Sequence, residues 1–119
     1  MYWYGDSAVV PKSVEFMQNM VPADPVAEAQ EAGFVDCVLF NSPDTMIRED
    51  AYLRGELVGE AAFRSGDSFF ARIEQSGELP ALLANIDKLK GEGRLDEYIT
   101  ERNKLRGEYG HVGVLCVTK

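Results

Sequence analysis

The sequence has few of the residue types from which metal and redox sites are built. It contains one histidine and two cysteines, and Cys37 and Cys116 lie far apart rather than in a CxxC pair. A zinc site needs several such ligands at close spacing, and a dithiol redox site needs two neighbouring cysteines. We therefore expect no metal site. Each cysteine lies in an apolar run, which predicts two buried, reduced thiols.

The sequence also has no apolar run that approaches the about 20 residues needed to span a bilayer. The N-terminal residues 1–6 show neither the basic leader nor the apolar segment of a secretion signal. These two features predict a cytoplasmic protein.

Positive charge is scarce. Twelve basic residues against twenty acidic ones give a formal net charge of -8, which repels phosphate backbones and anionic lipid headgroups. We therefore expect no nucleic-acid partner and no membrane partner. The late basic residues alternate with acidic ones, which is typical of a solvated, ion-paired helix face.

A length of 119 residues matches one domain with one core, spanning residues 1–119. Two segments, 34–40 and 112–117, are apolar at both alternating sets of positions, except at Asp36. Strands of this kind need cover on both faces, so both are predicted to be central, adjacent and antiparallel.

Helical spacing and end signals dominate the rest of the chain. Asp24, Pro25 and Gly33 are a cap, a first-turn proline and a stop for one short helix. The predicted helices are 11–20, 25–32, 47–63, a short helix carrying Phe69, Phe70 and Ile73, 79–90, and 94–106.

The predicted fold is therefore α/β or α+β: a small sheet of two adjacent antiparallel buried strands, about 34–40 and 112–117, covered by helices, with a long helical insertion between them. Two strands alone are marginally stable in water. The sheet therefore needs a third strand from residues 2–4 or 8–10, helices on both faces, or another chain that adds strands at an open edge.

Three segments resemble class I S-adenosylmethionine-dependent methyltransferases. "EAGFVDCVLF" is similar to the passage into their sixth strand, "GHVGVLCVTK" to their closing antiparallel strand, and "SGDSFFARIEQSGELPALL" to the helices near their substrate. The glycine-rich cofactor loop of that family is absent. The resemblance therefore implies a C-terminal, substrate-side domain, which binds S-adenosylmethionine only with a partner chain or by self-association.

Five residues are candidates for binding a small molecule: Trp3, Tyr4, Asp6, Phe70 and His111. The aromatic side chains either stack on a flat ligand or pack in the protein's own core. The histidine is either a general base or a residue at a strand edge.

Two main functions remain open from the sequence, beside a third, a complete small enzyme with a pocket around Tyr4, Phe70 and His111. One is a methyltransferase-like domain that binds a small organic molecule and depends on a partner for its cofactor. The alternative is a non-catalytic binding or assembly module that buries its sheet, or its aromatic N-terminus, against another subunit. Both interpretations predict a homo-oligomer or a partner chain.

Overall fold

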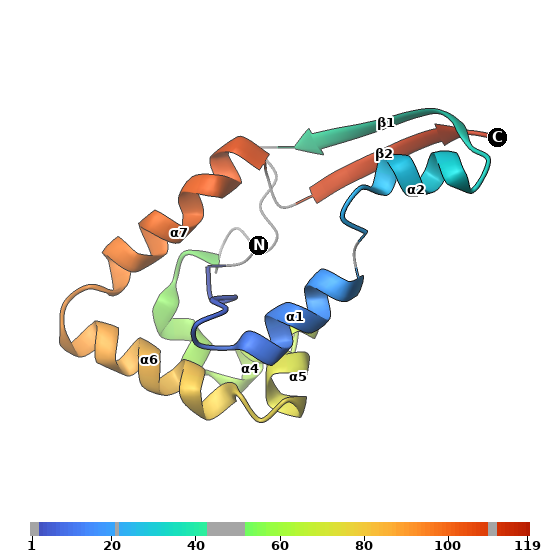
Figure 1. Ribbon diagram of the computed structural model, residues 1–119. Helices are drawn as coiled ribbons and strands as arrows, with labels where there is room; N and C mark the ends of the chain where they lie inside the picture. The colour runs from blue at the N-terminus through green and yellow to red at the C-terminus, as the bar shows by residue number, and fades with distance from the viewer. Residues whose placement is uncertain (1–2, 21, 43–51, 110–111) are drawn as a thin grey trace.

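The computed structural model describes residues 3–20, 22–42, 52–109 and 112–119. Helices form most of the molecule, and one two-stranded sheet lies at its end (Figure 1). The elements follow in the order α1 (Pro11–Met20), α2 (Pro25–Glu31), β1 (Val35–Ser42), η1 (Gly55–Gly59), α4 (Ala61–Arg64), α5 (Ser68–Gln75), α6 (Leu79–Gly91), α7 (Leu95–Tyr109) and β2 (Val112–Thr118). The predicted mixture of helices with two adjacent antiparallel strands, separated by a helical insertion, is confirmed.

Helix α2 begins and ends at the signals that its sequence carries. The Asp24 carboxylate accepts a hydrogen bond of 2.9 Å from the backbone N–H of Ala27, and Pro25 occupies the first helical position. Gly33, just after the helix, has φ of 88°, a left-handed conformation that glycine adopts without steric cost. The polypeptide then turns directly into β1.

Helix α1 is capped by a residue that lies far away in the sequence. The Glu78 carboxylate accepts hydrogen bonds from the backbone N–H groups of Lys12, at 2.8 Å, and Ser13, at 2.9 Å. These two donors lie in the first turn of α1, where no helical partner exists. A carboxylate there also meets the positive end of the helix dipole, so Glu78 joins the start of α6 to the start of α1.

The predicted helix at 47–63 is not continuous over the part that the structure describes, although Tyr52 and residues 61–63 are helical. Residues 43–51 lie outside the described residues, and from Gly55 the backbone forms the short 3-10 helix η1 and then α4. Gly55 and Gly59 carry no side chain to favour a continuous helix. Gly55 instead lets the backbone approach the side chains of Leu95 and Ile99 on α7.

Gly55→Ala is expected to destabilise the protein by about 1 to 3 kcal/mol, because overpacking forces neighbouring side chains out of place. A Cβ atom at Gly55 would lie 2.8 Å from Leu95 Cδ2 and 2.9 Å from Ile99 Cδ1. Gly59→Ala is the matched control, since a Cβ atom there meets nothing within 4 Å. Urea unfolding of both variants measures the difference, and equal losses would contradict this packing.

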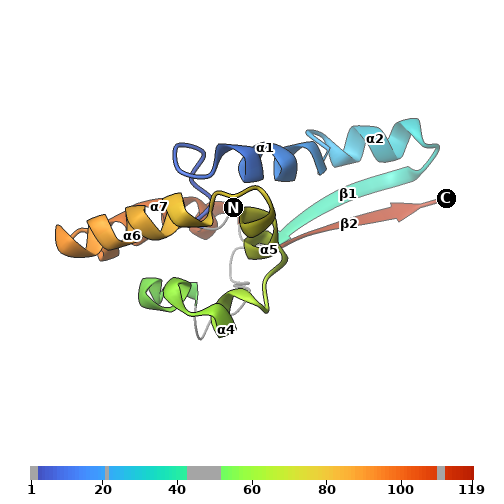
Figure 2. The same cartoon turned by 90° about the horizontal axis from the view of Figure 1, so that it is seen from below.

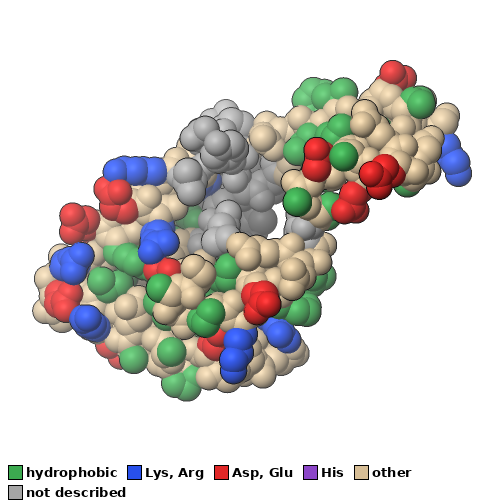
Figure 3. All heavy atoms as spheres, in the orientation of Figure 1, with side chains coloured by type: hydrophobic (Ala, Val, Ile, Leu, Met, Phe, Trp, Pro, Cys, Tyr) green, Lys and Arg blue, Asp and Glu red, His purple; other side chains and the backbone are tan. Residues whose placement is uncertain are grey.

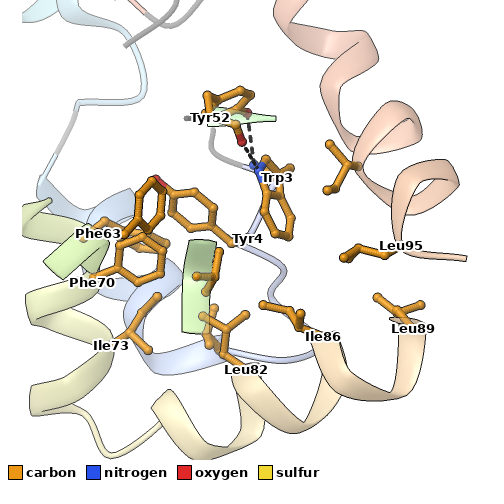
Figure 4. Packing of buried hydrophobic residues seen from close by; sticks show 14 of the residues in the cluster. Trp3, Tyr4, Tyr52, Phe63, Phe70, Ile73, Leu82, Ile86, Leu89 and Leu95 are labelled. Carbon is orange, nitrogen blue, oxygen red and sulfur yellow. Dashed lines mark hydrogen bonds between the residues drawn. The ribbon is translucent and has the colours of Figure 1, made fainter. Parts of the chain in front are cut away.

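The hydrophobic core lies where α5, α6, α7 and η1 surround the N-terminal segment (Figure 4). Phe70 is fully buried and stacks on Tyr4, with 4.5 Å between the ring centroids. Trp3 inserts from the same segment and packs edge-on against Tyr4, at 5.3 Å. Residues 3–10 therefore do not form the third strand that the sequence left open, because they supply buried aromatic side chains to the helices.

The sheet contains only β1 and β2 among the described residues. The pairs Val38–Cys116, Leu39–Leu115 and Phe40–Val114 fix an antiparallel register, which is interrupted by a bulge between Val35 and Val38. Asp36, inside that bulge, has φ of 49°. Bulges of this kind twist a strand locally and disturb its edge.

The predicted burial of both strands is wrong for the single chain. Most of their apolar side chains are exposed, among them Val35, Val38, Leu39, Phe40, Val114 and Val117. The cysteines follow the same pattern, since Cys37 is half-buried and Cys116 is exposed. The described helices between the strands pack on one another and around the N-terminal segment, and among the described helices only α2 packs closely against the sheet.

The molecule therefore divides into a helical body (residues 3–20 and 52–109) and an arm (residues 22–42 and 112–119). No described side chain of the arm belongs to the hydrophobic core. The arm projects from one end of the body (Figure 2), and the molecule measures 52 × 28 × 24 Å. Its radius of gyration of 16.3 Å exceeds the about 13.5 Å expected for a compact chain of this length.

Candidate functional site

The predicted ligand-binding aromatics face one another inside the helical body. Trp3 and Tyr4 are both almost fully buried. The Trp3 indole N–H donates a hydrogen bond of 2.6 Å to the backbone carbonyl of Tyr52, and the Tyr4 hydroxyl donates one of 2.7 Å to the Asp67 carboxylate. Both polar groups thus have partners within the chain (Figure 4 shows the Trp3 contacts). This arrangement matches the packing interpretation of the aromatic N-terminus.

Asp6 joins the N-terminal segment to α7. Its carboxylate accepts hydrogen bonds from the Tyr98 hydroxyl at 2.7 Å, Arg102 Nη2 at 2.6 Å and the backbone N–H of Ala8 at 2.9 Å. Burial by itself would raise the pKa of Asp6, but these hydrogen bonds and the Arg102 charge lower the pKa below its ordinary value. Asp6 is therefore a charged anchor with all its partners in the chain.

The hydrogen bond between Tyr98 and Asp6 also changes the pKa of Tyr98. Burial and the neighbouring Asp6 carboxylate raise the pKa of the Tyr98 phenol, so Tyr98 stays a hydrogen-bond donor throughout the physiological range. His111, the fifth candidate, lies outside the described residues. The structure thus brings Trp3, Tyr4 and Phe70 together and connects Asp6 to them through Tyr98, whose ring packs edge-on against Trp3 with 6.5 Å between the ring centroids.

One surface depression lies on the helical body beside α7. It encloses about 180 Å³ and is lined by Leu53, Asp96, Ile99, Thr100 and Asn103. Sites for small molecules usually measure about 300 to 1,000 Å³ and bury most of the ligand. None of Trp3, Tyr4, Asp6 and Phe70, the predicted binding residues that the structure describes, is among the residues that line this depression.

An exposed apolar surface lies on one face of the sheet, which we name the Phe40 face. Directly opposite residues of an antiparallel pair lie on one face, so the register groups Phe40 with Val114, Val38 with Cys116, and Val35 with Thr118. Phe40 is 57% exposed, Val35 54%, Val114 53% and Val38 47%. Figure 3 shows hydrophobic side chains at the surface of the arm.

The opposite face of the sheet, the Leu39 face, is partly shielded. Strand alternation places Leu39, Leu115 and Val117 on it, and Leu115 is the one half-buried residue of β2 among those whose side chains are described. Helix α2 contacts both strands and is itself half-buried at Val26, Ala27 and Ala29. This pattern of burial indicates that α2 lies over the Leu39 face and leaves the Phe40 face open.

Charge is absent from the Phe40 face and present around it. Its members Val35, Val38, Phe40, Val114 and Cys116 carry no formal charge. The acidic residues of the arm are Asp24, Glu28 and Glu31, next to or within α2, and Asp36 in the bulge. An apolar patch with a charged rim is typical of a surface that another protein covers.

Comparison of this chain with known proteins identified no relative. No protein-family model matches the chain, and searches of curated proteins and of solved structures found no match. The methyltransferase-like interpretation therefore stays a prediction. Within the described ranges, no group of three or more acidic, histidine or cysteine side chains is placed to hold a metal ion, and no helix is long and apolar enough to cross a membrane.

Sequence reasoning identified the apolar strands but assigned them to the protein's interior. A signal for the correct placement existed in the count of elements, because two strands leave two open edges and two faces that need cover. The alternative of cover by another chain followed from that count, and the structure leaves the Phe40 face available for it.

Proposed function

We propose that this chain is an assembly module, which buries its two-stranded sheet against another polypeptide chain. The observation that supports the proposal is the Phe40 face, where one phenylalanine and three valine side chains are about half exposed on a protein that has a separate core. The aromatic N-terminus is not available for the same role, because Trp3 and Tyr4 lie in that core.

Covering the Phe40 face would remove exposed apolar side-chain area from water. Fully burying a valine, leucine or phenylalanine side chain contributes about 1.5 to 3 kcal/mol, so covering the exposed half contributes about 1 kcal/mol per residue. Val35, Val38, Phe40 and Val114 together would therefore add about 4 kcal/mol from one chain. A partner with a similar apolar surface would contribute as much again.

The strand arrangement supports the same function. A two-stranded sheet gains independent stability from additional strands or from packing against another element. Helix α2 supplies such packing on the Leu39 face alone. Cover of the Phe40 face by a second polypeptide would complete the sheet as a two-layered structure.

Phe40→Lys tests this proposal on the isolated chain. In dilute solution we expect the variant to bind less of a fluorescent apolar dye than the wild type, because the largest side chain of the exposed patch is gone. Its free energy of unfolding should change by less than about 1 kcal/mol, since a half-exposed side chain loses little packing. Dye titration and urea unfolding measure the two quantities.

Met20→Lys is the matched control, because Met20 is another exposed apolar side chain but lies at the end of α1, outside the sheet. It should leave dye binding near the wild-type level. If Phe40→Lys instead costs several kcal/mol and the wild type binds no dye, the chain covers this face itself and the assembly function is wrong.

A further inference from the structure

We infer that the occupant of the Phe40 face is a second copy of this chain, packed face to face about a two-fold axis. This inference rests on the proposed function and identifies its partner. Three properties support it: the surplus of exposed area, the distribution of charge, and the shape of the face.

The exposed area of the chain exceeds that of an ordinary monomer by the size of an interface. The chain exposes 7556 Å², whereas a folded monomer of 13.2 kDa is expected to expose about 6,400 Å². The surplus of about 1,100 Å² is comparable with the about 800 Å² that each partner buries in a standard interface. Pairing of two arms would thus remove a surplus of the size that a stable dimer needs.

The charge distribution favours this face for self-association. Two copies with a formal charge of -8 each repel one another, so a symmetric contact through an acidic surface would place like charges together. The Phe40 face is uncharged at Val38, Phe40, Val114 and Cys116. Because α2 lies over the opposite face, its acidic side chains would point away from the second copy.

The shape of the face suits a two-fold contact. In such a contact the same patch of both copies meets, so the patch must be complementary to itself. Phe40 is the single large side chain of the face, and its neighbours Val38 and Val114 are small. With two sheets packed about 10 Å apart, the Phe40 ring of each copy would fit over the valines of the other.

The two cysteines allow a direct test, because only one of them belongs to the paired register. Cys116 is exposed and pairs with Val38 on the Phe40 face, whereas Cys37 is half-buried inside the bulge, where its thiol donates to the backbone carbonyl of Val35. We would measure the rate at which a small thiol reagent modifies each cysteine across a range of protein concentrations, with the mass of the species measured in parallel by sedimentation.

We expect a dimer whose Cys116 loses reactivity as the concentration rises, while the reactivity of Cys37 stays constant. At a chain concentration about ten times the dissociation constant, the Cys116 rate should fall about fivefold, because mass action leaves about a fifth of the chains monomeric. Phe40→Lys should abolish both the dimer and the concentration dependence. Val117→Lys adds the same charge to the same sheet, on the Leu39 face, and should leave both unchanged.

The remaining outcomes separate the inference from the proposed function. A monomer at all concentrations with a freely reactive Cys116 would overturn self-association, and the open face would then belong to a different protein partner. A monomer whose Cys116 is protected even in dilute solution would overturn both, because the chain would cover the face itself. A dimer that survives Phe40→Lys but not Val117→Lys would overturn the assigned face.

Discussion

Phe70→Ala is expected to lower the free energy of unfolding by about 3 to 5 kcal/mol, the usual cost of removing a buried aromatic ring from a filled core. Phe70 has no exposed surface, stacks on Tyr4, and packs edge-on against Phe63 at 5.7 Å between ring centroids. Alanine would leave a cavity among rings that other contacts hold in place. Urea or thermal unfolding, followed by circular dichroism, measures the loss.

Leu39→Ala provides the contrast for this prediction. The sequence pattern alone predicts a loss of about 2 to 5 kcal/mol at Leu39 and Leu115, as in a central strand. Because Leu39 is 40% exposed, the structure predicts a loss below about 1 kcal/mol for that residue. If Leu39→Ala were as costly as Phe70→Ala, the sheet would be part of the core. If Phe70→Ala were nearly neutral, Phe70 would instead line an open pocket.

Glu78→Ala is expected to cost about 2 to 4 kcal/mol, because it leaves several buried donors without an acceptor. The carboxylate accepts hydrogen bonds from the Ser13 hydroxyl at 2.5 Å and the Ser76 hydroxyl at 2.7 Å, besides the two backbone N–H groups that begin α1. Glu78→Gln keeps one acceptor oxygen and the side-chain shape, so it should lose less than Glu78→Ala. Equal losses would mean that the charge and the second oxygen carry the whole effect.

The pH dependence of stability tests the charge of Glu78 separately. Burial by itself raises the pKa of Glu78, but hydrogen bonds from Ser13, Ser76 and the α1 amides lower the pKa below its ordinary value of 4.5. The unfolded chain therefore takes up a proton first as the pH falls, and the stabilisation present above pH 4.5 is lost as the pH drops toward the folded-state pKa. The wild type should lose stability more steeply than Glu78→Gln below about pH 5, and parallel curves would contradict the role of the charge.

Local capping signals in the sequence were sufficient to predict the helices that begin or end at those signals. Pro25 at the first turn and Gly33 after α2 predicted this helix, because capping depends on residues within one turn. The pairing of β1 with β2 followed from two matching apolar runs, and the register confirms it.

Contacts between distant residues were beyond the reach of those signals. Glu78 meets Ser13 across 65 residues, and Arg102 meets Asp6 across 96 residues, so no local pattern marks either pair. The burial of the strands failed for a different reason. A strand that is apolar on both faces has the same sequence whether its own chain or another chain covers it.

Amide hydrogen exchange at two protein concentrations tests most directly whether the sheet is a docking surface outside the core. We expect slow exchange in α5 and α6 at both concentrations, because their buried faces belong to the core of the single chain. The amides of β1 and β2 should exchange faster than those helices in dilute protein and become protected as the concentration rises. Strands as well protected as α6 in dilute monomer would contradict the docking surface, because the chain would then stabilise its sheet without a partner.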